Sequence, residues 1–390
     1  MRRSSSKSRI EQGQLTPKLQ KFLAESKDRD PFLVVDVDVV EQNYRELRRL
    51  LPHARVYYAI KANPAPEILR RLRSLGSNFD TASAGEIEQC LSLGITPDRI
   101  SFGNTIKKKR DIAWAFDKGV RLYAFDSLCE LEKLAEVAPG SQVFCRVLME
   151  CEGAEWPLSR KFGCAPHMAA DLLVKARALG LDPYGISFHV GSQQTDLNQW
   201  DKAVAQVSQM FTVLQQHDVE LRMVNLGGGF PARYRSDVPM LEAYAQAIGN
   251  AMTKHFGNNL PDMIIEPGRG LVGDAGVIQA EVVLISEKDY GDDRRWVYLD
   301  IGKFSGLAET MDEAIKYRIV TPHDGGPTGP VALAGPSCDS ADILYEKTDY
   351  HLPLALRVGD KVQILSTGAY TTTYSSVGFN GFPPLKSYCI

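Results

Sequence analysis

The stretch Val56-Tyr57-Tyr58-Ala59-Ile60-Lys61-Ala62-Asn63-Pro64 carries an apolar strand pattern up to a single lysine. Its aromatic and β-branched residues favour a strand, and the Asn-Pro pair ends that strand before a helical pattern begins at Glu67. Lys61 is therefore predicted in a strand-to-helix loop. In parallel α/β folds ligands bind at the carboxyl ends of strands, and a lysine in apolar surroundings loses proton affinity and becomes a nucleophilic amine. The alternative is a lysine that only extends into solvent.

The Lys61 strand belongs to a regular alternation of helical and strand patterns. Capping-box pairs mark helix starts at Ser83 with Glu86 and at Ser127 with Glu130. Eight alternating strands in about 230 residues predict a (β/α)8 TIM barrel. The predicted strands are Val56–Ile60, Asn78–Asp80, Arg99–Phe102, Arg121–Phe125, Gln142–Leu148, Tyr184–His189, Arg222–Leu226 and Met263–Glu266.

The chain changes character after Gly276, where the helix-strand alternation stops. Val277–Ile285 is a long β-rich run, and shorter strand patterns follow between Gly, Pro and Asp turns. We therefore expect a barrel over residues 37–276 and a C-terminal all-β domain over residues 277–390. The strand pattern at Phe32–Val35 precedes the first helix of the barrel, so the segment 19–36 is expected to join the β domain. Residues 1–18 are expected to form a flexible basic arm.

Composition limits the class of partner. The chain of 390 residues has a formal charge of −3, which gives no electrostatic reason for binding nucleic acid, and no apolar run reaches the length of a membrane span. Seven scattered cysteines suggest reduced thiols and a cytoplasmic location. The histidines lack metal-ligand spacing, so no metal site is expected. The basic run Lys107–Arg110 is interpreted as a solvated helix face.

Polar residues recur at the carboxyl ends of the predicted barrel strands, which we call the rim. If the barrel closes, the rim forms one site. Asp126 has a simpler interpretation as a helix cap, Arg146 as a salt-bridged core residue, and Asp80 and Asn104 can be structural or functional. In chain order the rim residues are Lys61, Asp80, Asn104, Asp126, Arg146, His189, the glycine run Gly227–Gly229, and Glu266 with Arg269.

The rim has the groups needed to hold a phosphorylated, planar cofactor. Consecutive glycines leave backbone N–H groups free to surround an anion, and Arg269 in Glu-Pro-Gly-Arg adds a bidentate contact. Glu266 would keep a pyridine nitrogen protonated, which makes the ring an electron sink, and the imidazole of His189 could stack on that ring. Together with the amine of Lys61, these groups predict a site for pyridoxal 5′-phosphate.

Five motifs resemble those of the fold-type III pyridoxal-phosphate-dependent decarboxylases, in particular the ornithine/lysine decarboxylases. The resemblance implies an alanine-racemase-like barrel with a β domain, and a homodimer whose active sites are shared between chains. The motifs are Tyr-Ala-Ile-Lys-Ala-Asn around Lys61, Phe-His-Val-Gly-Ser-Gln from Phe188, Gly-Gly-Gly-Phe-Pro from Gly227, Glu-Pro-Gly-Arg from Glu266 and Gly-Pro-Ser-Cys-Asp from Gly335.

The resemblance also implies roles for single residues. Lys61 corresponds to the lysine that forms the Schiff base, and Cys338 and Asp339 to residues that act in the partner's site. Asp300, Asp339 and Tyr370 would contact substrate, with Asp300 facing its side-chain amine. The implied cofactor contacts are Lys61, Asp80, Arg146, His189, Ser192, Gly228, Gly229, Glu266, Gly268, Arg269 and Tyr370.

The sequence also departs from the eukaryotic ornithine decarboxylase pattern. Where those enzymes place an arginine four residues before Lys-Phe-Gly, this chain has Pro157, with Arg160 nearby. The segment after Asp300 resembles the bacterial lysine/ornithine decarboxylases instead. The lone Cys338 adjoins Asp339, and an adjacent carboxylate disfavours the thiolate, which suits a proton donor rather than a nucleophile.

Three functions fit these observations. The first is decarboxylation of L-ornithine and L-lysine to putrescine and cadaverine, in polyamine biosynthesis. The second is diaminopimelate decarboxylation or amino-acid racemisation on the same fold. A racemase needs a second base opposite the lysine, and Cys338 is a poor base at neutral pH. The third is a catalytically inactive regulator, which has no need for Lys61, Glu266, Arg269 and Cys338 together.

Overall fold

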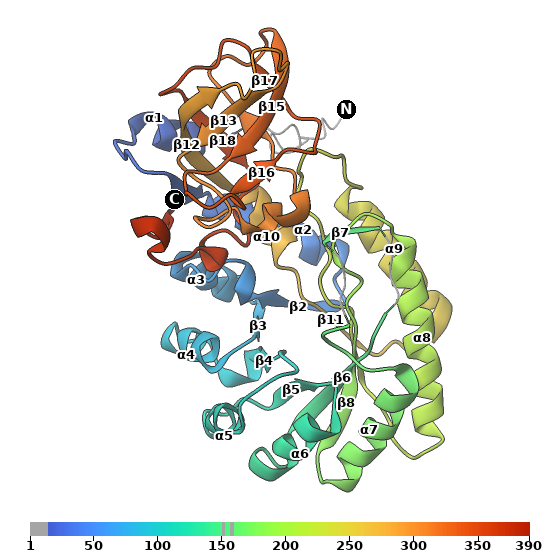
Figure 1. Cartoon of the computed structure of the whole chain (residues 1–390). Coiled ribbons are helices and arrows are strands. Elements are labelled where there is room, and N and C mark those ends of the chain that lie inside the picture. Colours follow the sequence, from blue (N-terminus) through green and yellow to red (C-terminus); the bar gives the residue numbers. More distant parts are fainter. Residues whose placement is uncertain (1–14, 150–152, 157–159) are drawn as a thin grey trace, which may run out of the picture. The chain divides into compact units, whose positions relative to one another are not determined.

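The computed structural model describes residues 15–149, 153–156 and 160–390. They form two compact units (Figure 1). One comprises residues 41–231 and 238–270, and the other comprises the described residues up to Val40 together with residues 232–237 and 271–390. Residues 232–237 thus belong to the second unit, whereas the sequence placed them in the barrel over residues 37–276.

The larger unit is a closed barrel of eight parallel strands, which confirms the predicted (β/α)8 architecture. The strands follow one another around the barrel in chain order, and the last strand, β11, closes it by pairing with the first, β2. All eight predicted strands are present, with ends that differ by a few residues. They are β2 (Ala54–Ala59), β3 (Asn78–Thr81), β4 (Ile100–Phe102), β5 (Leu122–Phe125), β6 (Gln142–Arg146), β8 (Asp182–Ser187), β10 (Met223–Asn225) and β11 (Asp262–Ile265).

Helices lie outside the barrel strands (Figure 1). Both predicted serine N-caps form, since the hydroxyl of Ser83 accepts from the N–H of Glu86 and that of Ser127 from the N–H of Glu130. The carboxylate of Glu86 accepts from the N–H of Ala82, and that of Glu130 pairs with Lys107. The helices are α2 (Val37–Leu50), α3 (Pro66–Ser74), α4 (Ala84–Ser92), α5 (Lys109–Asp117), α6 (Leu128–Val137), α7 (Pro166–Ala178), α8 (Asn198–Gln215), α9 (Leu241–Phe256) and α10 (Arg269–Val272). A short antiparallel pair joins β7 (Ala154–Trp156) to β9 (Ser192–Gln194).

A cluster of buried side chains from the barrel strands packs together. Large apolar and aromatic residues dominate it, so this part of the barrel is a packed core rather than a channel, and ligand chemistry is left to the rim. The cluster consists of Tyr57, Leu122, Ala124, Phe144, Tyr184, Met223 and Ile264.

The second unit is built on a nine-stranded sheet, as expected for the C-terminal β domain. The N-terminal strand β1 (Phe32–Val35) enters it between two C-terminal strands. It runs antiparallel to β12 (Gly276–Ser286) and parallel to β19 (Lys386–Cys389). The other strands are β13 (Arg295–Leu299), β14 (Ile319–Val320), β15 (Thr328–Ala334), β16 (Ile343–Tyr345), β17 (His351–Pro353) and β18 (Lys361–Leu365).

The helix α1 (Pro17–Glu25) packs on this sheet through Leu19 and Leu23. Thr16 caps it, accepting a hydrogen bond from the N–H of Leu19. The helix therefore starts inside the arm that was expected to end at residue 18; residues 1–14 of that arm lie outside the described residues. Within the described ranges, no helix is both long enough and apolar enough to cross a membrane.

Two interpretations of single residues were wrong. Lys107, expected on a solvated helix face, is 4% exposed, because α5 begins only at Lys109 and the Lys107 side chain turns inward. Asp126, expected as a helix cap, leaves that position to Ser127 and instead accepts a hydrogen bond from the N–H of Gly163 at 2.8 Å.

Candidate active site at the barrel rim

Lys61 lies directly beyond the end of β2, in a single 3-10 turn at Ile60–Ala62. The turn is held at both ends. Ala59 donates its N–H to the carbonyl of Pro267 at 3.1 Å, and the hydroxyl of Tyr58 donates to the carbonyl of Asn63 at 2.9 Å. The Lys61 side chain is exposed, which corrects the expectation of apolar surroundings. Its setting is polar and charged.

Asp80 and Glu266 place two carboxyl groups at the rim close to Lys61. Asp80 is buried at the end of β3 and accepts a hydrogen bond from the hydroxyl of Ser101 at 2.8 Å. Burial, followed by the charge of Glu266, raises the pKa of Asp80 well above its ordinary value, and the charge of Lys61 opposes that shift. Two carboxylates and one amine therefore share an electrostatic environment.

Arg146 and His189 complete the charged part of the rim. Burial lowers the pKa of the Arg146 guanidinium, and the carboxylates of Glu266, Asp126 and Asp80 oppose that shift. Burial also lowers the pKa of His189 to about 3, with Arg146 and Lys61 adding to the effect. His189 is therefore a neutral imidazole at neutral pH. A neutral ring can lie against a planar cofactor without adding charge.

The glycine run follows β10, and its conformation requires glycine. Gly227 has φ +67° and Gly229 has φ +97°. A Cβ on Gly227 would lie 2.3 Å from the Phe188 carbonyl oxygen, and one on Gly228 would lie 2.8 Å from the Glu266 carbonyl oxygen. The run therefore packs against the segments that carry His189 and Glu266. This close packing requires glycine, and a run without side chains is the kind of backbone segment that binds a phosphate through its N–H groups.

Other predicted phosphate contacts flank this surface. Ser192 is half-buried at the start of β9, and Gly268 is buried next to Arg269, which is 5% exposed at the start of α10. The donor set of backbone N–H groups, a hydroxyl and a guanidinium fits a phosphate. Together with the amine of Lys61, the rim fits pyridoxal 5′-phosphate.

Sequence reasoning missed three residues at the rim. Asn225, the last residue of β10, donates to the carboxylate of Glu266. Glu86 was predicted only as a capping residue. Burial raises its pKa, and a hydrogen bond from the N–H of Ala82 and the charge of Lys61 oppose that rise. Phe162 lies under the guanidinium of Arg146, at 5.1 Å from the ring centroid. A polar residue in an apolar strand pattern, two residues before the glycine run, was the available signal for Asn225.

Asn104, which lies just after β4, has a structural role. Its side chain donates to the Ala82 carbonyl at 3.1 Å and accepts from the N–H of Ile106. Both bonds shape the loop after β4. Of the departures noted in the sequence, Pro157 lies outside the described residues, and Arg160 is exposed.

Cys338, in the β domain, lies in an exposed loop that is fixed by two other segments. Its N–H and its thiol both point to Oδ1 of Asn380, at 3.0 and 3.4 Å. The backbone N–H can only donate, so that atom is the amide oxygen and the thiol is the donor. The buried carboxylate of Asp342 accepts from Ser337 and from the N–H of Lys303, which ties the loop to the segment after β13.

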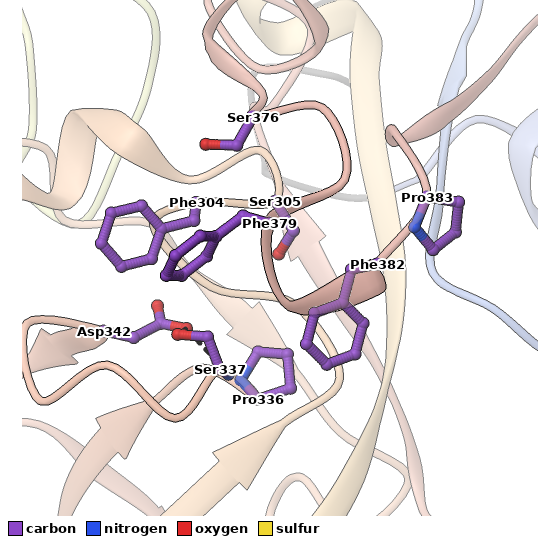
Figure 2. A pocket seen from close by; sticks show the side chains of 9 residues that line it. All are labelled: Phe304, Ser305, Pro336, Ser337, Asp342, Ser376, Phe379, Phe382 and Pro383. Atoms are coloured by element: carbon purple, nitrogen blue, oxygen red, sulfur yellow. Dashed lines mark hydrogen bonds between the residues drawn. The ribbon is translucent and has the colours of Figure 1, made fainter.

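A pocket lies beside the Cys338 loop, within the β domain (Figure 2). In this view the rings of Phe304 and Phe379 lie above the Ser337 hydroxyl and the Asp342 carboxylate. The rings of Phe304 and Phe379 are in contact, with centroids 4.9 Å apart. The lining residues are Phe304, Ser305, Pro336, Ser337, Asp342, Ser376, Phe379, Phe382 and Pro383.

The predicted substrate carboxylates have separate local partners. Asp300 accepts from the N–H of Glu281 at 2.7 Å, and Asp339 accepts from the N–H of Ala341 at 2.8 Å. Burial raises the pKa of Asp300 to about 6, and the carboxylate that adds to this shift is Glu281. Tyr370 has φ +54°, and its ring lies 5.8 Å from that of Tyr374.

No group of three or more His, Cys, Asp or Glu side chains suited to a metal ion occurs in the described part of the chain.

Comparisons with known proteins agree with this geometry. Residues 37–273 match a protein family that is described as the pyridoxal binding domain of pyridoxal-dependent decarboxylases. A lysine/ornithine decarboxylase of Selenomonas ruminantium is 37% identical over 354 residues, covering 90% of this chain and 87% of the relative. The structure of SrLDC in complex with PLP and cadaverine aligns with a TM-score of 0.85 at 34% identity, covering 97% of this chain and 94% of that one. The lysine/ornithine decarboxylase from Vibrio vulnificus, complexed with cadaverine, has the same TM-score at 30% identity and covers 97% and 100%.

Proposed function

The chain belongs to the family of pyridoxal-dependent decarboxylases, and we propose that it removes the α-carboxyl group of L-ornithine and L-lysine as CO2. The products would be the diamines putrescine and cadaverine, which makes polyamine biosynthesis the proposed setting. The observation that carries the proposal is the rim itself, where Lys61, Asp80, Arg146, His189 and Glu266 share one electrostatic environment beside the glycine run. The relatives named above support the choice of substrates.

Pyridoxal 5′-phosphate, when bound, supplies an electron sink for the charge left at Cα after CO2 departs. The Lys61 amine would hold the cofactor covalently, and Glu266 would hold a proton at the pyridine nitrogen. His189 would cover one face of the ring. Asp80 and Arg146 would lie near it. The phosphate would be bound by Ser192, Gly228, Gly229, Gly268, Arg269 and Tyr370.

Cys338 is proposed as the group that returns a proton to Cα. Its thiol already donates a hydrogen bond to the Asn380 oxygen, which is the direction that suits a proton donor. A racemase would need a base at this position, and a thiol that keeps its proton is a poor base. This favours decarboxylation over racemisation.

The substrate's terminal ammonium is proposed to lie between Asp300 of one chain and Asp339 contributed by the other chain of a dimer. Opposite charges in a water-poor pocket give specificity for a cation. Diaminopimelate, the alternative substrate, ends in an ammonium and a carboxylate, so two anionic side chains disfavour it. The pocket is proposed to accept both ornithine and lysine, because the one methylene by which they differ changes the binding free energy by only about 1–3 kcal/mol.

The working unit is proposed to be a homodimer in the cytoplasm. Cys338 and Asp339 would complete the partner's site rather than their own. The proposed location rests on cysteine usage: the six cysteines within the described ranges form no disulfide bonds, which suits a reducing compartment.

A substrate panel tests the proposal. Purified holoprotein is incubated with ornithine, lysine, arginine and diaminopimelate, and CO2 release is measured, with Lys61→Ala as the inactive control. CO2 from ornithine and lysine is expected. Release from diaminopimelate alone, racemisation without CO2, or no turnover at all would contradict the proposal.

A further inference from the structure

Asn225 occupies a position fixed on both sides by the barrel. It is 1% exposed and is paired in register with Ser187 of β8 and Ile264 of β11. Its carbonyl also accepts from the N–H of Phe188 at 3.1 Å. The neighbouring strands lead directly to His189 and Glu266. Backbone contacts alone therefore fix the position of Asn225, independently of its side chain.

The side-chain amide of Asn225 joins two parts of the rim. Its Oδ1 accepts from the N–H of Gly227 at 3.0 Å, and its Nδ2 donates to Oε1 of Glu266 at 2.5 Å. The N–H of Gly227 can only donate, so the amide oxygen must face it, and the NH2 group must face the carboxylate. Each bond thus fixes the orientation of the other. A third bond, from the N–H of Glu266 to the Gly227 carbonyl at 2.8 Å, closes the unit.

We propose that Asn225 is a positioning residue that holds the Glu266 carboxylate and the glycine run as one rigid unit. The terminal torsion of a glutamate is broad, so an unheld carboxylate samples many orientations. With Oε1 engaged by Asn225, the other carboxylate oxygen would be the one left to hold a proton at the pyridine nitrogen. The same amide fixes the first glycine of the phosphate cradle. The inference rests on the proposed function, because it requires pyridoxal 5′-phosphate at the rim.

Two substitutions test the two hydrogen bonds of the Asn225 side chain, one to Gly227 and one to Glu266. Asn225→Leu keeps a similar volume and removes both. Asn225→Asp keeps an acceptor for the Gly227 N–H, but it can donate to Glu266 only while it is protonated. The matched control is Asn78→Leu, which removes an amide at the start of β3, at the opposite end of the barrel, where Nδ2 donates to the Val56 carbonyl at 3.2 Å.

Three measurements are made on each variant. Cofactor affinity is measured by fluorescence titration of the apoprotein with pyridoxal 5′-phosphate. The protonation of the ring nitrogen is read from its 15N chemical shift with labelled cofactor. The third measurement is kcat as a function of pH.

Asn225→Leu should bind the cofactor more weakly, move the ring-nitrogen signal toward the unprotonated value, and lower kcat by about ten- to a hundredfold, the range seen when groups that orient a metal ligand are removed. Asn78→Leu should leave the signal and the affinity unchanged.

Asn225→Asp should keep most of the cofactor affinity but lose kcat as pH rises, since deprotonation removes the donor and places two carboxylates together. The pH at which this loss occurs will depend on the charged and titratable groups that face the site, namely Lys61, Asp80, Arg146, His189 and Glu266.

The inference is overturned if Asn225→Leu retains the affinity, ring-nitrogen signal and kcat of the parent. If that variant does not fold, an Asn225→Asp protein with the parent's pH profile and signal overturns it. Glu266→Gln, measured in parallel, separates this inference from the proposed function. A ring-nitrogen signal unmoved by Glu266→Gln refutes the assignment of Glu266 itself, whereas a signal moved by Glu266→Gln but not by the Asn225 variants refutes only the positioning role.

Discussion

Lys107 and Glu130 form an ion pair in which both side chains are buried, with Nζ 3.0 Å from Oε1. Lys107 also donates to the carbonyls of Asn104 and Ala124. It therefore joins the loop after β4 to β5 and α6. Burial lowers the pKa of Lys107 to about 8, and the charge of Glu130 opposes that shift. The carboxylate thus keeps the buried ammonium charged.

Glu130→Gln should lower the free energy of unfolding by about 3–5 kcal/mol, because it leaves a buried ammonium without its ionic partner. Glu132→Gln, on the exposed face of the same helix, is the control and should change stability by less than about 0.5 kcal/mol. Urea unfolding of both variants provides the measurement. Equal midpoints would show that the pair contributes little.

Borohydride reduction of the holoprotein should attach the cofactor permanently to Lys61. Among the lysines at predicted strand ends, it is the one that shares its surroundings with Asp80 and His189. Peptide mapping by mass spectrometry locates the label. A label on another lysine, or full turnover by Lys61→Ala, would show that the assignment is wrong.

Glu266→Gln should lower kcat more than it raises KM. A neutral amide cannot hold the pyridine nitrogen protonated, so the charge at Cα is poorly delocalised while substrate binding is kept. Steady-state kinetics with ornithine separates the two parameters. A raised KM with an unchanged kcat would assign Glu266 to binding instead.

Mixing inactive Lys61→Ala with inactive Cys338→Ala should restore activity if each site uses residues from two chains. Random exchange makes half of the dimers hybrids, each with one intact site, so about a quarter of the parent activity is expected. The control mixes Lys61→Ala with the double variant, which cannot form an intact site. Demonstrated subunit exchange without recovered activity would refute the shared site.

Asp339→Asn should weaken binding of ornithine and lysine alike, by about 2–5 kcal/mol, because one partner of a desolvated charge pair is lost. Asparagine can still accept the Ala341 N–H, so the turn is kept while the charge is removed. The ratio of kcat/KM for the two substrates in the parent is the second measurement. A preference above roughly a thousandfold would exclude dual use, since it exceeds what one methylene provides.

The barrel and its eight strands were predictable because each signal is local. Caps such as Ser83 and alternating strand patterns depend on neighbours a few residues away. The rim followed from a topological rule, since carboxyl ends of parallel strands meet at one end of the barrel. Lys61, His189 and Glu266 could therefore be grouped before any contact was known.

Contacts between distant segments could not be predicted in this way. The Asn225–Glu266 bond depends on the register of β10 against β11, and the Cys338–Asn380 contact joins two loops of the β domain. Lys107 looked like part of a solvated basic run because its partner, Glu130, lies 23 residues later in the chain, on α6. Charge in the sequence does not reveal which side chains turn inward.

The pairing of β1 with β12 and β19 constrains the order in which the chain can fold during translation. β1 leaves the ribosome early, but both of its partners are synthesised only after the entire barrel. The barrel strands can close as soon as β11 has emerged, while β1 must wait with an unpaired, wholly apolar edge. The β domain is thus the last part to mature, and a nascent chain stalled before β12 would expose a strand suited to aggregation or to chaperone binding.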